Sequence, residues 1–381
     1  MFQLHLSEFT QAEFLRDYWQ KKPVVIRQGF QHFEDPISAD ELAGLACEEE
    51  VESRLIYKEA EQWQAKFGPF ESYDHLGEKD WSLVVQALDN WSEDAAQIIE
   101  AFRFIPHWRL DDLMASFATP GGSVGPHIDL YDTFICQGSG KRHWRVGGQG
   151  EHQQFAAHEA LLHVKEFDAI IDVELLPGDI LYIPPGHPHE GKTLETSLSF
   201  SVGFRTNSTV TLVSGLADYL IDNELGDELI EDPERIAVDN PGAINKSDFH
   251  LLKNHLTKLL DNDDFIRQFT GTYLTQAKHE LDLVESEEAF EAEDVSEILA
   301  DNTLMRLGGL RAFYFTESVE NGLCYIDGAE HKFSPEIAGA VKLLCDNVVV
   351  TPEQIEPWRS NSDFIDFICP LLNRGYWYFS A

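Results

Sequence analysis

The chain has 381 residues, 43% hydrophobic and 12% aromatic, so it is neither disordered nor fibrous and is long enough for two or three domains. Its 28 Lys and Arg residues stand against 67 Asp and Glu residues, giving a formal net charge of −39. This charge argues against naked nucleic acid as a partner and would steer a basic partner toward the protein. Acidity alone is also a common means of keeping a protein soluble.

No targeting or membrane-spanning segment is recognisable in the sequence. The opening stretch MFQLHLSEFTQAEFL lacks the basic start and the unbroken apolar run of a secretory signal. No run approaches the roughly 18–20 apolar residues of a membrane helix. The five cysteines are odd in number and scattered, which is typical of reduced thiols. We therefore expect a soluble, cytoplasmic protein.

The first hundred or so residues mix helices with strands. Residues 7–20 predict an amphipathic helix, in which Thr10 and Glu13 have the spacing of a capping box. A buried strand is expected over residues 23–27. Further helices are expected over residues 35–46, 81–91 and 95–102.

From residue 109 to residue 205 the chain consists of short β-type runs separated by Gly and Pro turns. The run LLPGDILYIPPG is bracketed by Pro-Gly pairs and forms a turn–strand–turn unit. Short strands at close, regular spacing indicate a sandwich or barrel, and this unit is typical of a double-sheet jelly roll.

Beyond Arg205 the pattern becomes helical and then mixed. Apolar residues follow helical spacing over residues 211–225, 247–260 and 263–276. An acidic run over residues 285–297 separates these helices from the last part of the chain. For residues 302–381 we expect a small α/β module that ends in a wing-like hairpin.

The stretch GGSVGPHIDLYD carries a candidate metal site. His127 and Asp129 lie two residues apart in a segment with strand character, so their side chains share one face. This pair is two thirds of the 2-His-1-carboxylate set that binds non-haem Fe(II). The third ligand is expected from His187 or His189, which strand alternation cannot separate. His189 is preferred because His187 lies in the preceding turn, immediately before a proline.

The stretch KRHWRV offers a cation for a co-substrate. Alternation places Arg142, Trp144 and Val146 on the same face, and the apolar pair marks that face as buried. If the co-substrate is 2-oxoglutarate, its far carboxylate needs a cationic partner inside the barrel. A buried Arg142 would fill this role through a bidentate ion pair. The alternative is a structural ion pair within the protein.

Long stretches of the chain resemble the bacterial cupin-like JmjC ribosomal oxygenases. They include PGGSVGPHIDLYD, QGSGKRHWRVG, FDAIIDVELLPGDILYIPPGHPHEG, RLGGLR and the closing NRGYWYF. The resemblance implies an oxygenase that uses Fe(II), 2-oxoglutarate and O2. It places the metal ligands on His127, Asp129 and His189, and the 2-oxoglutarate-binding arginine on Arg142. His187 departs from the family's pattern, in which an apolar aromatic residue is expected.

The resemblance also implies an α+β fold in three parts. These are a double-stranded β-helix (the cupin/JmjC jelly roll) with N-terminal helices in residues 1–207, a helical dimerisation region in residues 208–284, and a winged-helix domain in residues 285–381. The winged helix does not imply DNA binding, because its segment contains no basic recognition helix. We expect a homodimer with no membrane attachment.

By the same resemblance, the substrate is an arginine side chain of large-subunit ribosomal protein sixteen, hydroxylated at its β-carbon. Tyr131, Asp132 and Ser201 are candidate contacts for this basic substrate, although Asp132 could instead cap a turn. Two alternatives come from other classes. A cupin-type dioxygenase or isomerase of a small molecule would not need Arg142, and a non-catalytic protein-binding scaffold would not consume 2-oxoglutarate.

Overall fold

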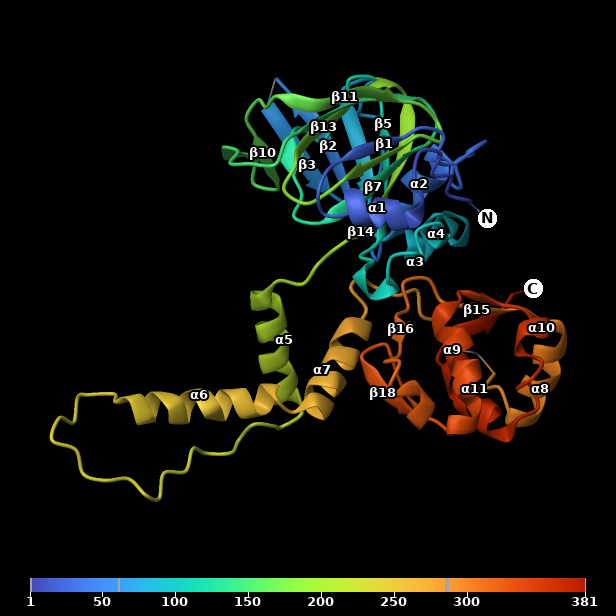
Figure 1. The fold of residues 1–381 in the computed structure, drawn as a ribbon. Helices are drawn as coiled ribbons and strands as arrows, with labels where there is room; N and C mark the ends of the chain where they lie inside the picture. Colours follow the sequence, from blue (N-terminus) through green and yellow to red (C-terminus); the bar gives the residue numbers. More distant parts are fainter. Residues whose placement is uncertain (1, 61, 285–287, 381) are drawn as a thin grey trace. The chain divides into compact units, whose positions relative to one another are not determined.

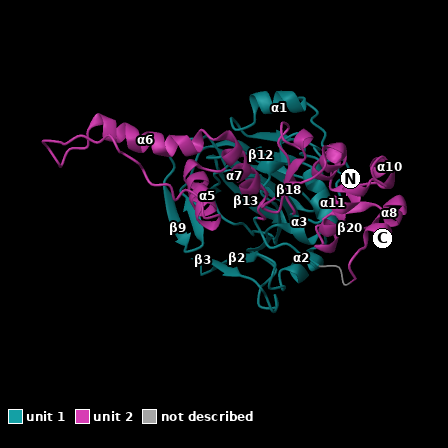
Figure 2. Cartoon of the chain, turned by 90° about the horizontal axis from the view of Figure 1, so that it is seen from below, with its two compact units in different colours: residues 1–206, 278–284, 307–309 teal, residues 207–277, 285–306, 310–381 magenta. Residues whose placement is uncertain are grey.

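The computed structural model describes residues 2–60, 62–284 and 288–380, which fall into two compact units (Figure 1). Unit 1 comprises residues 1–206, 278–284 and 307–309, and unit 2 comprises residues 207–277, 285–306 and 310–381; Figure 2 colours them separately. Each unit buries apolar side chains of its own. The predicted division into residues 1–207, 208–284 and 285–381 stays a prediction.

Unit 1 is built on antiparallel strands. They are β1 (Val24–Ile26), β2 (Ser53–Glu59), β3 (Gln62–Phe67), β4 (Trp81–Val85), β5 (Leu113–Ala118), β6 (His127–Ile128), β7 (Asp132–Gln137), β8 (Lys141–Gly147), β9 (Gln154–His158), β10 (Leu161–Val164), β11 (Ala169–Leu175), β12 (Ile180–Ile183), β13 (Pro188–Glu195) and β14 (Ser197–Phe204).

These strands form a double-sheet barrel. Eight of them lie in one sheet in the order β1-β12-β7-β14-β5-β4-β2-β3, four lie in a second sheet in the order β11-β8-β13-β6, and β9 and β10 form a separate pair. From β5 to β8, and again from β11 to β14, successive strands alternate between the two main sheets, which is the jelly-roll pattern, whereas β1–β5 all lie in the larger sheet. The predicted jelly roll is confirmed.

Four helices cover the outer face of the larger sheet. They are α1 (Gln11–Asp17), α2 (Ala39–Leu45), α3 (Leu88–Trp91) and α4 (Glu93–Glu100). The predicted capping box of Thr10 and Glu13 is present at α1. Strand β7 shows how the faces divide. Phe134 packs against Phe14 of α1, with ring centroids 5.4 Å apart, while its neighbour Ile135 faces the barrel interior with β8 and β12.

The helix predicted over residues 81–91 is wrong for most of its length. Residues Trp81–Val85 form strand β4, and only Leu88–Trp91 is helical. Both faces of β4 are buried, because Leu83 and Val85 belong to the cluster under the helices and Val84 to a cluster on the other side. A strand buried on both faces has no alternating pattern, so its apolar run cannot be told from a buried helix.

Unit 2 contains the predicted helical region and the small α/β module. Its helices are α5 (Thr209–Asp222), α6 (Lys246–Leu260), α7 (Asp263–Thr275), α8 (Ala292–Asp301), α9 (Ala338–Asp346), α10 (Pro352–Ile355) and α11 (Ser362–Asn373). Its strands are β15 (Leu304–Arg306), β16 (Ala312–Phe313), β17 (Leu323–Ile326), β18 (Ala329–Lys332), β19 (Val349–Val350) and β20 (Trp377–Phe379). Of the acidic run, residues 285–287 lie outside the described residues and residues 292–297 belong to α8.

The predicted C-terminal hairpin is not formed. The last strand, β20, pairs with β15, about seventy residues earlier in the chain, in the sheet β19-β15-β20. The hairpin of this module is β17–β18, where Asp327 and Gly328 both have positive φ. Asp-Gly is a preferred pair for such two-residue turns.

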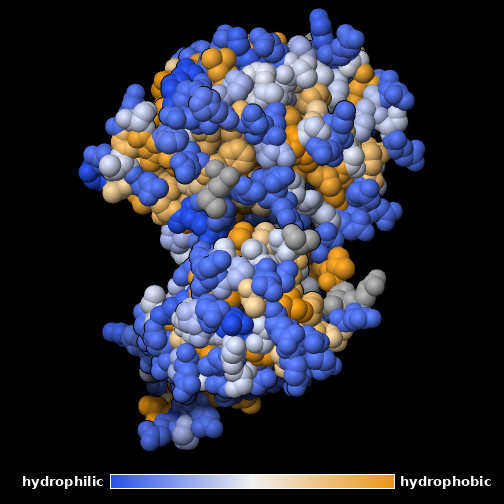
Figure 3. All heavy atoms as spheres, turned by 90° about the vertical axis from the view of Figure 1, so that its right-hand side faces the viewer, coloured by the Kyte–Doolittle hydropathy of each residue, from blue (hydrophilic) through white to orange (hydrophobic). Residues whose placement is uncertain are grey.

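Hydrophilic side chains cover most of the face shown in Figure 3, with smaller apolar patches between them. None of the helices in the described parts of the chain is long and apolar enough to cross a membrane.

Candidate metal centre and co-substrate cavity

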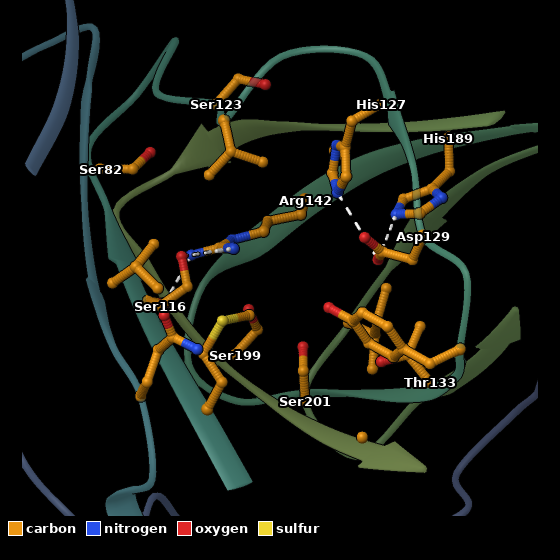
Figure 4. A pocket seen from close by; sticks show the side chains of 18 of the residues that line it. Ser82, Ser116, Ser123, His127, Asp129, Thr133, Arg142, His189, Ser199 and Ser201 are labelled. Carbon is orange, nitrogen blue, oxygen red and sulfur yellow. Dashed lines mark hydrogen bonds and ion pairs between the residues drawn. The ribbon is translucent and has the colours of Figure 1, made fainter. Parts of the chain in front are cut away.

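Three side chains converge at one end of the smaller sheet (Figure 4). His127 on β6 is the register partner of His189 on β13, so the two imidazoles lie side by side. Asp129 follows β6 directly, and its Oδ2 lies 3.7 Å from Nε2 of His127 and 3.5 Å from Nε2 of His189. The ligand atoms of all three lie within 4.8 Å of one another.

Backbone contacts turn both imidazoles toward the centre. Nδ1 of His127 lies 2.9 Å from the carbonyl oxygen of Gly125, and Nδ1 of His189 lies 3.0 Å from that of His187. With Nδ1 as the donor to a carbonyl, each Nε2 keeps its lone pair for a metal ion. Gly125 has φ +84°, and a Cβ there would lie 2.2 Å from the ring of His163, so this loop requires glycine.

The protonation states match those of metal ligands. Burial, reinforced by the neighbouring His189, lowers the pKa of His127 to about 4. Burial alone would raise the pKa of Asp129, but the imidazoles of His189 and His127 beside it lower it to about 2. At neutral pH the centre therefore offers neutral imidazole and a carboxylate, the forms that bind a divalent metal. This donor set fits Fe(II).

The structure brings His189, and not His187, to the centre. His187 is buried in the turn before β13, where its Nδ1 lies 3.4 Å from the carbonyl oxygen of Pro185. It does not line the cavity. Within the described ranges, the three predicted ligands form the only cluster of His, Cys, Asp or Glu residues able to hold a metal ion.

Arg142 lies in the same cavity, on β8, and is 6% exposed. Its guanidinium donates to the hydroxyl groups of Ser197 and Ser116, at 2.8 and 3.2 Å, and to the carbonyl oxygen of Ser116 at 2.7 Å. No carboxylate among the described residues pairs with it. Burial lowers the pKa of Arg142 to about 10, so it remains charged at neutral pH.

The predicted substrate contacts divide into two groups. Tyr131 and Ser201 line the cavity. Asp132 does not: it is fully buried on the opposite face of β7, where its carboxylate accepts hydrogen bonds from Tyr182 and Gln20. The substrate role predicted for Asp132 therefore has no support in the geometry, because its side chain is already engaged elsewhere.

Three charged residues that sequence reasoning missed line the same cavity: Asp111, Asp112 and Arg205. Asp111 pairs with Nε of Arg205 at 3.0 Å and with Nζ of Lys278 at 2.5 Å. Asp112 is 9% exposed and accepts the backbone N–H of Ala87 at 3.0 Å. Asp111 and Asp112 directly precede β5 in the stretch DDLMASF. Because side chains alternate along a strand, Asp112 lies on the same side as Met114 and Ser116, which line the cavity.

The chain is similar to known proteins over nearly its whole length. Residues 97–212 match the JmjC domain family and residues 258–378 match the ROXA-like winged helix. The chain is 44% identical over 97% of both chains to the ribosomal protein uL16 3-hydroxylase of Escherichia coli K12. It is 38% identical, over 55% of this chain and 53% of the relative, to a probable ribosomal oxygenase of Haemophilus influenzae.

Solved structures give the same result. The crystal structure of E. coli YcfD superposes with a TM-score of 0.93 at 43% identity, covering 100% of both chains. A structure of YcfD, described as a ribosomal oxygenase in complex with cobalt and 2-oxoglutarate, superposes with a TM-score of 0.91 at 42% identity, again over 100% of both chains.

Proposed function

We propose that this protein hydroxylates ribosomal protein uL16 in a reaction dependent on Fe(II), 2-oxoglutarate and O2. The chain belongs to the ribosomal oxygenases that combine a JmjC domain with a ROXA-like winged helix. The target is an arginine side chain, and the hydroxyl group is added at carbon 3, the β-carbon. The protein acts in the cytoplasm. The relative of E. coli is named for 3-hydroxylation of uL16, which supports both the substrate and the carbon.

One observation carries the proposal. A complete 2-His-1-carboxylate set and a buried guanidinium without a carboxylate partner line the same cavity. A dicarboxylate that reaches from the metal centre to Arg142 satisfies both groups at once. A cupin enzyme of a small molecule would not need Arg142, and a protein-binding scaffold would need neither Arg142 nor the metal-binding set.

Each part of the site has a separate task. Fe(II) with bound 2-oxoglutarate supplies the oxidative chemistry. His127, Asp129 and His189 would hold the metal ion. Arg142 anchors the far carboxylate of the co-substrate, with Ser116 and Ser197 fixing its guanidinium in place. The barrel wall limits the access of water to this end of the cavity.

The acidic side of the cavity suits an arginine substrate. Asp111 is already paired with two cations, whereas no cation partner of Asp112 is found in the described parts of the chain. Burial raises the pKa of Asp112, because its carboxylate has lost solvent without gaining a full counter-charge. A substrate guanidinium would provide that charge, and the ring of Tyr131 offers it an apolar surface.

Replacing Asp112 with asparagine is expected to raise the KM for uL16 by about tenfold to a hundredfold, since one partner of a buried ion pair is removed. Asp112→Asn keeps an acceptor for the N–H of Ala87, so the fold is preserved. The binding of 2-oxoglutarate should not change. Steady-state kinetics with uL16 as the varied substrate checks this.

Asp132→Asn is the matched control for that variant. It should lower the melting temperature, because Asp132 holds Tyr182 and Gln20, and should leave the KM for uL16 unchanged. If Asp132→Asn raises the KM and Asp112→Asn does not, the assignment of the substrate carboxylate is wrong.

The active form is a homodimer whose subunits meet through α6. None of the residues of this helix is buried in the chain. Phe249, Leu252, Leu256 and Leu260 follow helical spacing along one face and are 56%, 50%, 68% and 55% exposed. An apolar stripe of this length on a monomer marks a protein interface, and a second copy of α6 is the partner that matches it.

Leu256→Glu is therefore expected to convert the dimer into a monomer, because it buries a charge in the apolar stripe. Light scattering coupled to size-exclusion chromatography gives the mass of each form. Asn254→Glu, on the opposite face of α6, should remain dimeric. A wild-type protein that elutes as a monomer at micromolar concentration would contradict the proposal.

A further inference from the structure

The indole of Trp144 lines the cavity beside Arg142, and its N–H has no hydrogen-bond partner within the described ranges. The residue is only 7% exposed, and the nitrogen atom itself is fully buried. A buried donor left without an acceptor costs about 1–3 kcal/mol. Such a group in the wall of a binding cavity points to a ligand that supplies the acceptor.

The strand register places Trp144 between the two ends of the co-substrate site. On β8 and β13, Arg142 is opposite Thr193, Trp144 is opposite Gly191, and Val146 is opposite His189. The indole therefore occupies the level between the arginine and the metal ligand His189. Its ring centroid lies 6.2 Å from that of His189.

Gly191 makes room for the ring at this level. A Cβ on Gly191 would lie 2.7–2.8 Å from three carbon atoms of the indole, so any other residue there would displace the ring from this position. The other side of Trp144 packs in the barrel core with Ile135 and Leu181, which fixes the plane of the indole. The donor is thus held in one orientation before any ligand binds.

Other buried polar atoms without a partner occur in the described parts of the chain, among them Oε1 of Gln137 and Nε1 of Trp377. Neither residue lines the cavity. Among the described residues, Trp144 alone combines an unpaired buried donor with a position in the cavity wall.

We propose that the indole N–H of Trp144 donates a hydrogen bond to an oxygen atom of 2-oxoglutarate and so fixes the co-substrate between Arg142 and the metal. This inference rests on the proposed function, because it places the co-substrate along β8. Trp144 is then a co-substrate-binding residue, and its donor is satisfied only in the loaded enzyme.

The test removes the N–H and keeps the ring. In full-length protein, Trp144 is replaced with benzothienylalanine, in which sulfur takes the place of the N–H group. Isothermal titration calorimetry then measures 2-oxoglutarate binding with Co(II) in place of Fe(II), without turnover. We expect the dissociation constant to increase about tenfold or more, since a hydrogen bond to a charged acceptor is lost. The ligand-free protein should melt at the wild-type temperature or above it, because the N–H that is removed has no partner to lose.

Trp144→Phe serves as a second, fully genetic variant, and Trp377→Phe is its matched control. Both replace a buried indole with a smaller phenyl ring and remove an unpaired N–H, so both lower the melting temperature through the volume that is lost. Only Trp144→Phe should weaken 2-oxoglutarate binding relative to the wild type.

Arg142→Met separates failure of this inference from failure of the proposed function. If Arg142→Met abolishes binding and the benzothienylalanine protein binds 2-oxoglutarate like the wild type, the role of Trp144 is disproved and the site stands. If neither variant changes the affinity, the co-substrate does not lie along β8, and the proposed site falls with the inference. A lower melting temperature of the ligand-free benzothienylalanine protein would show that the N–H has a partner already, which also overturns the inference.

Discussion

Replacing Asp129 with alanine is expected to reduce hydroxylation of uL16 to background, a loss of about a thousandfold or more. The variant removes the only carboxylate of the metal centre, so the cavity loses both a ligand and the charge that balances the cation. His127→Ala should have the same effect. Calorimetric titration with Co(II) checks the cause directly, because both variants should lose metal binding together with activity.

The fold should survive these changes. His127 lies on the short strand β6 and Asp129 directly after it, and their mutual contact lies across the site and not in the core packing. His187→Phe is the matched control, since it changes a buried histidine two residues from a ligand but outside the cavity. It should keep metal binding. Full activity in Asp129→Ala would remove the basis for the metal centre.

Arg142→Met is expected to have the second-largest effect, an increase of about a hundredfold or more in the dissociation constant of 2-oxoglutarate. The variant keeps the length and apolar stem of the side chain and removes the cation that the far carboxylate needs. Metal binding in the absence of co-substrate should not change, because Arg142 contacts Ser116 and Ser197 and none of the ligands.

The ligand-free Arg142→Met protein should be as stable as the wild type or more so. A buried guanidinium without a carboxylate partner costs desolvation energy that methionine avoids, which offsets the lost bonds to serine. Thermal melts with and without 2-oxoglutarate separate the two effects. Normal 2-oxoglutarate binding and turnover in this variant would favour an enzyme of a small molecule that keeps the metal triad alone.

Most of what the sequence predicts about the site follows from the alternation of side chains along a strand. The period of two put Arg142, Trp144 and Val146 on the inner face of β8, and all three are buried there. The same rule, applied from Asp129, puts Tyr131 on the cavity side and Asp132 on the other side. The sequence thus already argued against Asp132 as a substrate contact.

The rest depends on contacts between strands that are far apart in the chain. His187 and His189 have the same parity, and only the pairing of β13 with β6 brings His189 beside His127. The meeting of Asp111, Arg205 and Lys278 needs three separated segments. The strand β4 was missed for a related reason, because burial on both faces erased its local pattern.

The most direct test of the account is to incubate the purified protein with Fe(II), 2-oxoglutarate, O2 and uL16, and to map the product by tandem mass spectrometry. We predict one added oxygen atom on a single arginine of uL16, located at its β-carbon, together with succinate, and neither product with Asp129→Ala. Unmodified uL16 in the presence of active 2-oxoglutarate turnover would contradict the proposed substrate, and oxygen on a different residue would contradict the proposed arginine.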